Sequence, residues 1–172
     1  HIALSEHLIE TTLNQIAAMA AAMGLDEASG RDAGLKALRH YREFSRRCRN
    51  WVETELKTLA GEPTVIIAGR PYITCSPHVN LALPRKIASR GYHVLSADML
   101  PLLHGTLPER DVWHFTQQIS NAVAHANRAE QMSVCLVSCF SCGPDASMYH
   151  YYRQELAGST FCYLEIDSHT AH

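Results

Sequence analysis

The sequence predicts an α/β fold, in which a helical hairpin precedes a four-stranded, parallel, Rossmann-like sheet with flanking helices. Up to residue 60, apolar side chains recur at helical spacing. Gly61, Glu62 and Pro63 interrupt that pattern, and after them short apolar runs alternate with amphipathic stretches. This alternation is typical of βαβ units. We therefore divide the chain into a helical hairpin segment, 1–61, and a parallel α/β domain, 62–172, both read as part of a larger protein.

The helical segment contains two apolar stripes separated by Gly24, which supplies a stop signal for the first helix. The first stripe consists of Leu4, Leu8, Leu13, Ile16, Met19 and Met23, and the second of Leu35, Leu38, Tyr41, Phe44, Cys48, Val52 and Leu56. Most of the arginines between residues 39 and 49 lie off the second stripe. Two helices that pack as a hairpin are expected.

In the α/β domain, buried strands are predicted at 64–68, 93–96, 133–137 and 160–166, because these runs are short and rich in Val, Ile, Leu or Tyr. Helices are predicted at 83–90, 112–128 and 144–156. Pro84 and Pro144 suit first helical turns, Asp111 suits an N-cap, and Gly91 and Gly158 suit helix ends. The irregular stretch 97–110 is expected to cover the site as a loop.

The composition of the chain limits which kinds of partner it can bind and where in the cell it is expected. Fifteen Lys and Arg against 17 Asp and Glu give a formal charge of −2, which offers no broad footprint for nucleic acid or acidic lipid. No apolar run approaches the length of a membrane span. The six cysteines are too few for a disulfide scaffold. We expect a cytoplasmic protein that binds neither nucleic acid nor membrane.

Candidate functional residues follow the predicted strands. The carboxyl ends of parallel strands meet at one edge of a sheet, where ligands bind. The expected edge collects Gly69 to Tyr72 from the first loop, Asp98 from the second, Cys139 to Asp145 from the third, and Asp167 and His169 from the fourth. Arg70, Tyr72, Asp98, Asp145 and Asp167 are therefore candidate ligand-binding residues.

Cys142 stands at the predicted start of a helix, where free backbone N–H groups and the helix dipole favour an anion. This position favours a thiolate, which is a better nucleophile or metal ligand than a buried thiol. The alternative is that Gly143-Pro144-Asp145 is only a helix start and Cys142 a small packed side chain.

Cys139 and Cys142 have C-x-x-C spacing, which indicates either a redox pair or two ligands of a zinc or iron–sulfur site. There is no second C-x-x-C, so further ligands would come from residues such as Cys75, His78 or His169. Cys135 and Cys162 fall within predicted strands and are expected in the core.

Arg70 follows the first strand and is suited to clamp a phosphate or carboxylate. The alternatives are a solvated side chain or a salt bridge to Asp98 or Asp167. His169, beside Asp167, is a candidate base for Cys142, or else a structural residue. Dinucleotide-binding, Walker A and G-x-S-x-G motifs are absent from the sequence.

Four motifs in order carry a family resemblance: Ala68-Gly69-Arg70-Pro71-Tyr72 with Asn80 and Pro84; Trp113; Ser138-x-x-Ser141 through Ala146; and Leu164-x-Ile166 through Thr170. The chain resembles the uncharacterised domain of acyl-CoA dehydratase activase-related proteins, the activator type associated with 2-hydroxyglutaryl-CoA dehydratase, also called the CoA enzyme activase type. The resemblance covers about residues 62–172, and the helical segment adds little to it. In this chain Ile73, Thr74 and Cys75 replace a histidine and an acidic residue that relatives often have.

The resemblance implies a domain of a larger protein that takes part in ATP-dependent activation of acyl-CoA dehydratases. It implies an ATP site in another domain, a [4Fe–4S] cluster in the parent protein, and Cys142 as a ligand. Its partners would be other domains of the same protein and acyl-CoA dehydratase components. The isolated domain is not expected to catalyse a reaction.

Three functional hypotheses follow. The first is a domain that holds or contacts an iron–sulfur cluster through Cys142, with Cys139 and Cys75 as weaker ligand candidates. The second is a module that binds an anionic small molecule, such as a CoA thioester. The third is an enzyme with Cys142 as nucleophile and His169 as base.

Overall fold

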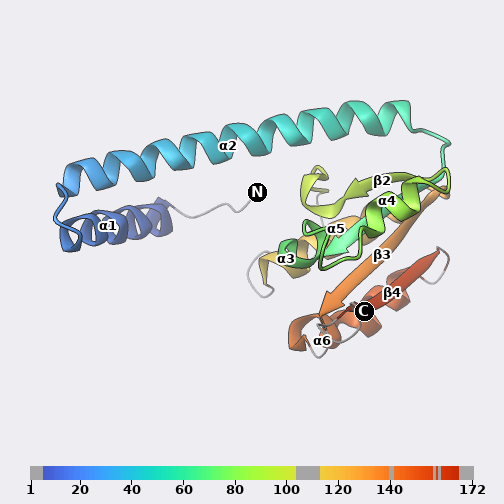
Figure 1. The fold of residues 1–172 in the computed structure, drawn as a ribbon. Coiled ribbons are helices and arrows are strands. Elements are labelled where there is room, and N and C mark those ends of the chain that lie inside the picture. The colour runs from blue at the N-terminus through green and yellow to red at the C-terminus, as the bar shows by residue number, and fades with distance from the viewer. Residues whose placement is uncertain (1–5, 104–112, 140–141, 157, 159, 167–172) are drawn as a thin grey trace. The chain divides into compact units, whose positions relative to one another are not determined.

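The computed structural model describes residues 6–103, 113–139, 142–156, 158 and 160–166. The chain forms two compact units, residues 1–50 and 51–172 (Figure 1). The division falls inside helix α2, Glu27–Thr58, so its last two turns belong with the sheet. The predicted boundary lies instead in the loop after this helix.

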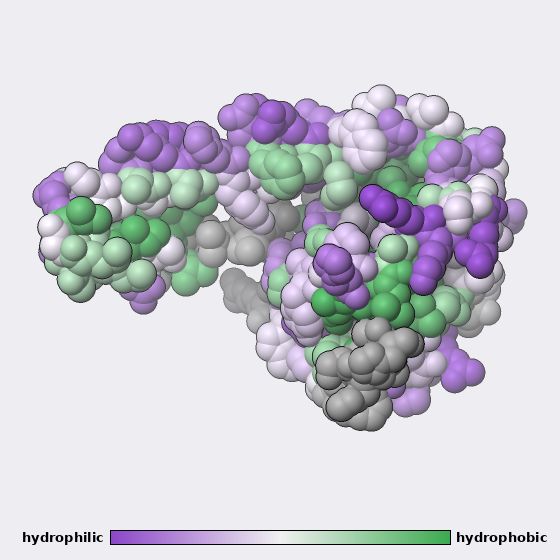
Figure 2. Space-filling model, in the orientation of Figure 1, coloured by the Kyte–Doolittle hydropathy of each residue, from purple (hydrophilic) through white to green (hydrophobic). Residues whose placement is uncertain are grey.

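The first unit is a helical hairpin, as the sequence predicted. Helix α1, Glu6–Ala22, ends before Gly24, whose φ is +77°. The Asp26 carboxylate accepts hydrogen bonds from the backbone N–H and the hydroxyl of Ser29, at 2.9 and 3.0 Å, as α2 begins. Glycine allows close packing: a Cβ on Gly30 would lie 2.5 Å from the Ala20 Cβ. Figure 2 shows hydrophilic residues along α2.

The second unit is built on a parallel sheet of four strands, which confirms the predicted fold class. The strands are β1, Thr64–Gly69; β2, His93–Ser96; β3, Met132–Cys139; and β4, Phe161–Ile166. Their order is β2-β1-β3-β4, and every neighbouring pair is parallel. Strands β1 and β3 are therefore central, and all carboxyl ends share one edge (Figure 1).

The helices of this unit are α3, Pro71–Thr74; α4, Leu83–Ala88; α5, His114–Ala126; and α6, Gly143–Glu155, with a 3₁₀ helix, η1, at Ala97–Met99. Neither α3 nor η1 was predicted, because a single turn is too short to show helical periodicity. Trp113 occupies the N-cap of α5, while the predicted cap, Asp111, lies outside the described residues. Pro144 lies in the first turn of α6.

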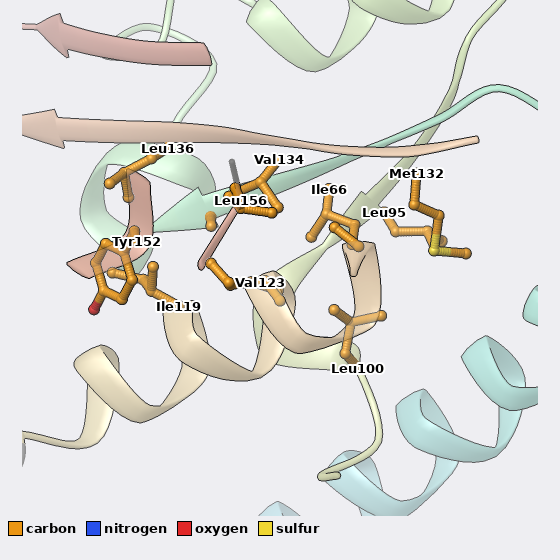
Figure 3. Close-up of a cluster of buried hydrophobic side chains, with 14 of the residues drawn as sticks. Ile66, Leu95, Leu100, Ile119, Val123, Met132, Val134, Leu136, Tyr152 and Leu156 are labelled. Carbon is orange, nitrogen blue, oxygen red and sulfur yellow. The ribbon is translucent and has the colours of Figure 1, made fainter. Parts of the chain in front are cut away.

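Both faces of the sheet carry apolar clusters. The larger packs α5, α6 and the end of α2 against the sheet, and Figure 3 shows Ile66, Val134 and Leu136 of the strands facing Ile119 and Val123 of α5. The smaller comprises Ile67, Ile73, Cys135 and Val137, with side chains from α4 packed against it. Among the helices that the structure describes, none combines the length and apolarity needed to cross a membrane.

Side chains of α5 hold the segment that follows η1. Asn121 accepts a hydrogen bond from the Leu103 N–H at 2.9 Å and donates one to the Pro101 carbonyl at 3.0 Å. The same carbonyl lies 2.8 Å from Nε2 of His125, which is the donor because a carbonyl only accepts. The segment 101–103 is thus fixed to α5, while the rest of the predicted covering loop, 104–110, lies outside the described residues.

Candidate functional site

The site lies where β1 and β3 end side by side. Gly69, the last residue of β1, has φ of +150°. A Cβ at this position would stand 2.2 Å from the Val137 carbonyl oxygen of β3. Only glycine permits this approach without a shift of the backbone. It brings the loop that carries Arg70 and Tyr72 against the end of β3.

Arg70 pairs with Asp145, the buried carboxylate in the first turn of α6. Nη2 of Arg70 lies 3.3 Å from Oδ1 of Asp145, and the two side chains are 15% and 1% exposed. The hydroxyl of Ser138, near the end of β3, donates to Oδ2 of Asp145 at 3.0 Å. One carboxylate therefore connects the first loop, the end of β3 and the start of α6. Of the two salt-bridge partners predicted for Arg70, Asp98 instead accepts a hydrogen bond from Ser96, and Asp167 lies outside the described residues.

The Arg70 guanidinium is held by several groups at once. Its Cζ lies 5.3 Å from the ring centroid of Phe115 on α5, a cation–π arrangement. Burial disfavours the charged form, but a hydrogen bond to Cys142 and the charge of Asp145 outweigh burial and raise the pKa of Arg70. The Nε atom is buried without a hydrogen-bond partner. The Arg70 guanidinium thus brings a positive charge to the site, and its buried Nε–H group is a hydrogen-bond donor without a partner.

Cys142 is the N-cap residue of α6. Its backbone N–H donates to the Cys139 carbonyl at 2.9 Å, and its own carbonyl accepts from the Ala146 N–H at 2.9 Å. Its side chain makes no capping hydrogen bond, so the thiol is not tied to the backbone of the helix start. Cys139 and Cys142 are both partly exposed. The predicted helix-start position of Cys142 is confirmed.

Tyr72 lies near both of these thiols. Its side chain is 58% exposed. Partial burial, and then negative charge at Cys139 and at Cys142, raise the pKa of its phenol. The phenol therefore stays neutral at physiological pH. Arg70 and Tyr72 from the first loop thus meet Cys139, Cys142 and Asp145 from the third, as the convergence of strand ends predicted.

Other candidates do not join this cluster in the described structure. The Cys75 thiol is exposed and contacts the neighbouring Thr74 hydroxyl at 3.7 Å. Asp98 is exposed and accepts a hydrogen bond from Ser96. Asp167 and His169 lie outside the described residues, so their part in the site stays a prediction.

The donor set for a metal is incomplete within the described ranges. There, no three His, Cys, Asp or Glu side chains are grouped so that they could hold an ion. Cys75, Cys139 and Cys142 therefore do not form a three-ligand site by themselves. The described residues offer two neighbouring thiols at the sheet edge, and metal binding by any of the three cysteines stays a prediction.

Two residues of the site were not assigned a role from the sequence. Ser138 is 1% exposed and fixes Asp145, and Phe115 supports Arg70. A serine at a strand end followed by an acidic residue in the next helix turn is a weak signal for such a hydrogen bond. For Phe115, the second residue of its helix, no sequence signal separates this contact from ordinary core packing.

Comparison with known proteins gives a family but no individual relative. No curated protein and no solved structure matches the chain. The family model described as the CoA enzyme activase uncharacterised domain matches residues 2–100. This range contains Arg70 and Tyr72, but not the Cys139–Asp145 segment. It also includes the helical hairpin, which corrects the expectation that the first 61 residues add little to the resemblance. Because the match spans more than half of the 172 residues, the chain belongs to the CoA enzyme activase uncharacterised domain family.

Proposed function

We propose that the carboxyl edge of the sheet is a thiolate site of a CoA enzyme activase-type protein, and that Cys142 and Cys139 are ligands of an iron–sulfur cluster. The observation that carries this proposal is the backbone hydrogen bond of 2.9 Å that joins Cys142, at the start of α6, to Cys139, at the end of β3. The two cysteines thus stand together at the edge where Arg70 pairs with Asp145. Both cysteines are free and partly exposed, and cysteine sulfur is the usual protein ligand of iron–sulfur clusters.

The described residues supply only part of the ligand set that an iron–sulfur cluster needs. Iron–sulfur clusters are commonly held by four cysteine thiolates, whereas the described edge carries two neighbouring cysteines, Cys139 and Cys142. The remaining ligands would come from residues outside the described ranges or from a partner. Other domains of the parent protein and acyl-CoA dehydratase components are the proposed partners. When bound, a cluster would supply one-electron transfer.

Within this proposal, each neighbouring residue has a physical role. Arg70 offsets the negative charge of the thiolates, and Asp145 and Ser138 hold Arg70 in place. Tyr72 presents a neutral phenol beside both sulfur atoms. A cytoplasmic location belongs to the same proposal, because these free thiols suit a reducing compartment.

Anaerobic reconstitution with iron and sulfide tests the cluster. Wild type is expected to bind iron and show the broad visible absorption of a cluster, and Cys142→Ala to lose both. Cys48→Ala, in the helical hairpin, is the matched control and should retain them. Equal iron content in wild type and Cys142→Ala would contradict the assignment, as would the absence of iron from every protein.

A second candidate is an anionic small molecule, such as a CoA thioester, bound at the same edge. It is favoured by one observation, the buried Nε of Arg70 without a partner. Equilibrium dialysis with CoA should then show binding by wild type and Cys142→Ala, but not by Arg70→Gln. Arg128→Gln, at an exposed position just after α5, is the control. Loss of iron binding without loss of CoA binding in Cys142→Ala separates the two candidates.

The third candidate is a cysteine-dependent enzyme with Cys142 as nucleophile and His169 as base. It stays a prediction, because His169 lies outside the described residues. The rate of Cys142 alkylation as a function of pH, compared between wild type and His169→Ala, tests it. An unchanged profile in the variant would exclude His169 as the base.

A further inference from the structure

Two cysteines away from the proposed site face each other across neighbouring strands. Cys135 of β3 and Cys162 of β4 are direct partners in the parallel register. Neighbouring strands are spaced about 4.8 Å apart, and disulfides join Cα atoms about 4.4 to 6.8 Å apart. Directly paired residues also project from the same face of the sheet. The backbone therefore places these two thiols within bonding reach.

The surroundings of the two thiols differ sharply. Cys135 is 4% exposed and packs with Ile67, Ile73 and Val137. Cys162 is exposed, which corrects the expectation that both lie in the core. The difference arises because β3 is central and β4 is an edge strand. Figure 2 shows hydrophobic residues at the surface over β3 and β4.

The neighbouring thiol of Cys162 also influences the ionisation of Cys135. Burial first, and then the charge and hydrogen bonding of Cys162, raise the pKa of Cys135 to about 12. Cys135 therefore remains a thiol at neutral pH. Of the two, Cys162 is the sulfur that a reagent in solution meets first.

We propose that Cys135 and Cys162 form a reactive dithiol that exchanges with small-molecule disulfides and closes to a cross-strand disulfide. The Cys162 sulfur, as thiolate, attacks the small-molecule disulfide, forms a mixed disulfide and releases one thiolate. The Cys135 sulfur, after losing its proton to solvent, then attacks the Cys162 sulfur and releases the second. Two protein thiols are oxidised, and one small-molecule disulfide is reduced to two thiols.

This dithiol is separate from Cys139 and Cys142, which lie at the carboxyl edge. Cys139 pairs in register with Ile166 rather than with a cysteine, and Cys142 belongs to the start of α6. The inference therefore does not depend on the proposed cluster. Exchange at the dithiol requires neither iron nor Arg70.

The test uses the full chain incubated anaerobically with oxidised glutathione. The six thiols of the chain should fall by two, and a disulfide-linked pair of tryptic peptides should appear. Trypsin cleaves after Arg128 and Arg153, so Cys135, Cys139 and Cys142 share one peptide and Cys162 lies on the next. Variants therefore have to identify which cysteine is linked.

Cys162→Ser, at an exposed position, should fold normally and lose the linked peptides, and Cys135→Ala should lose them as well. The Cys139→Ala/Cys142→Ala double variant and Cys48→Ala should retain them. Linked peptides that survive in Cys135→Ala, or that vanish in the double variant, would assign the disulfide to the carboxyl-edge cysteines and overturn the proposal. A stable mixed disulfide at Cys162 with no linked peptides would also overturn it.

A trivalent arsenical gives a second readout that needs no oxidant, because it bridges two neighbouring thiols. Phenylarsine oxide should protect two thiols of the Cys139→Ala/Cys142→Ala variant from alkylation. No protection should occur once Cys162→Ser is added to that variant. Equal alkylation with and without the arsenical in the double variant would show that the sulfurs of Cys135 and Cys162 cannot be bridged.

Discussion

Gly69 is the residue on which the approach of the first loop to β3 depends. An added Cβ would lie 2.2 Å from a backbone oxygen, which cannot swing aside as a side chain can. We expect Gly69→Ala to lower the free energy of unfolding by about 1 to 3 kcal/mol, measured by urea denaturation. Gly158→Ala, where nothing lies within 4 Å, is the control and should cost far less. Equal losses would contradict this account of the site.

Asp145 is expected to be the most sensitive charged residue of the site. Asp145→Ala leaves the largely buried Arg70 without its counter-ion, which should cost about 2 to 4 kcal/mol. Asp32→Ala, which breaks an exposed pair with Lys36 on α2, should cost far less, because solvent screens that pair. The Arg70→Ala/Asp145→Ala double variant should lose less than the sum of the single variants. Additive losses would show that the two side chains do not interact.

His125 gives the protein a dependence of stability on pH. Burial lowers the pKa of its imidazole, while the unfolded chain keeps a value of about 6.5. The unfolded state then binds the proton more readily, so the contribution of His125 to stability is complete above pH 6.5. It is lost as the pH falls from there through the lowered pKa of the folded state.

His125→Gln should therefore show a smaller fall in unfolding free energy between pH 7 and pH 5 than wild type. Burial also lowers the pKa of His114. The His125→Gln variant should therefore keep part of the dependence of unfolding free energy on pH. Chemical denaturation at several pH values measures both slopes. A steeper slope in His125→Gln would mean that the folded state favours the protonated imidazole.

At the scale of elements, the turn into α4 carries backbone strain. Leu81 and Ala82 have φ of 53° and 55°, the left-handed region that glycine adopts most readily. Ala82→Gly should relieve this strain and stabilise the domain by about 0.5 to 1 kcal/mol. Ala88→Gly, at the exposed end of the same helix, is the control and should destabilise it by up to about 1 kcal/mol. Thermal melts compare the two, and destabilisation by both would contradict the strain.

The elements were predicted well where a repeating pattern defines them. The four strands and three longer helices of the α/β unit lie close to their predicted places, since burial on one or both faces imposes periodicity. Helix α3 and η1 were missed because each has one turn. Helix η1 follows β2 directly, and α3 begins one residue after β1, at Pro71, which was assigned only to a loop.

At the scale of the whole molecule, the end of α2 belongs to the α/β unit. Val52 is fully buried and Leu59 is 6% exposed within the larger apolar cluster. A fragment of residues 51–172 should unfold cooperatively. A fragment of residues 62–172 lacks Val52 and Leu59, and the burial of each contributes about 1.5 to 3 kcal/mol to the free energy of unfolding. Circular dichroism during thermal melting compares them. Equal melting temperatures would place the boundary after residue 61 instead.

The candidate site was predictable in outline but not in detail. The convergence of Arg70, Tyr72, Cys139, Cys142 and Asp145 follows from parallel strands, whose carboxyl ends share one edge. The sequence did not predict which acidic residue pairs with Arg70. Asp98, Asp145 and Asp167 each follow a predicted strand, so all three were expected at the same edge. Strand β1 lies between β2 and β3, so the strand order leaves both Asp98 and Asp145 as neighbours. The packing of the Arg70 side chain against Phe115 and the first turn of α6 decides for Asp145.

The sequence by itself determined the fold class, the helical hairpin and the family, because periodicity and motifs are properties of local sequence. The tertiary structure alone decided which side chains meet: Ser138 and Arg70 on Asp145, and Cys135 opposite Cys162. It also decided that Cys162 is exposed while Cys135 is buried. These facts depend on strand order, register and edge position, which are set by contacts between residues far apart in the chain.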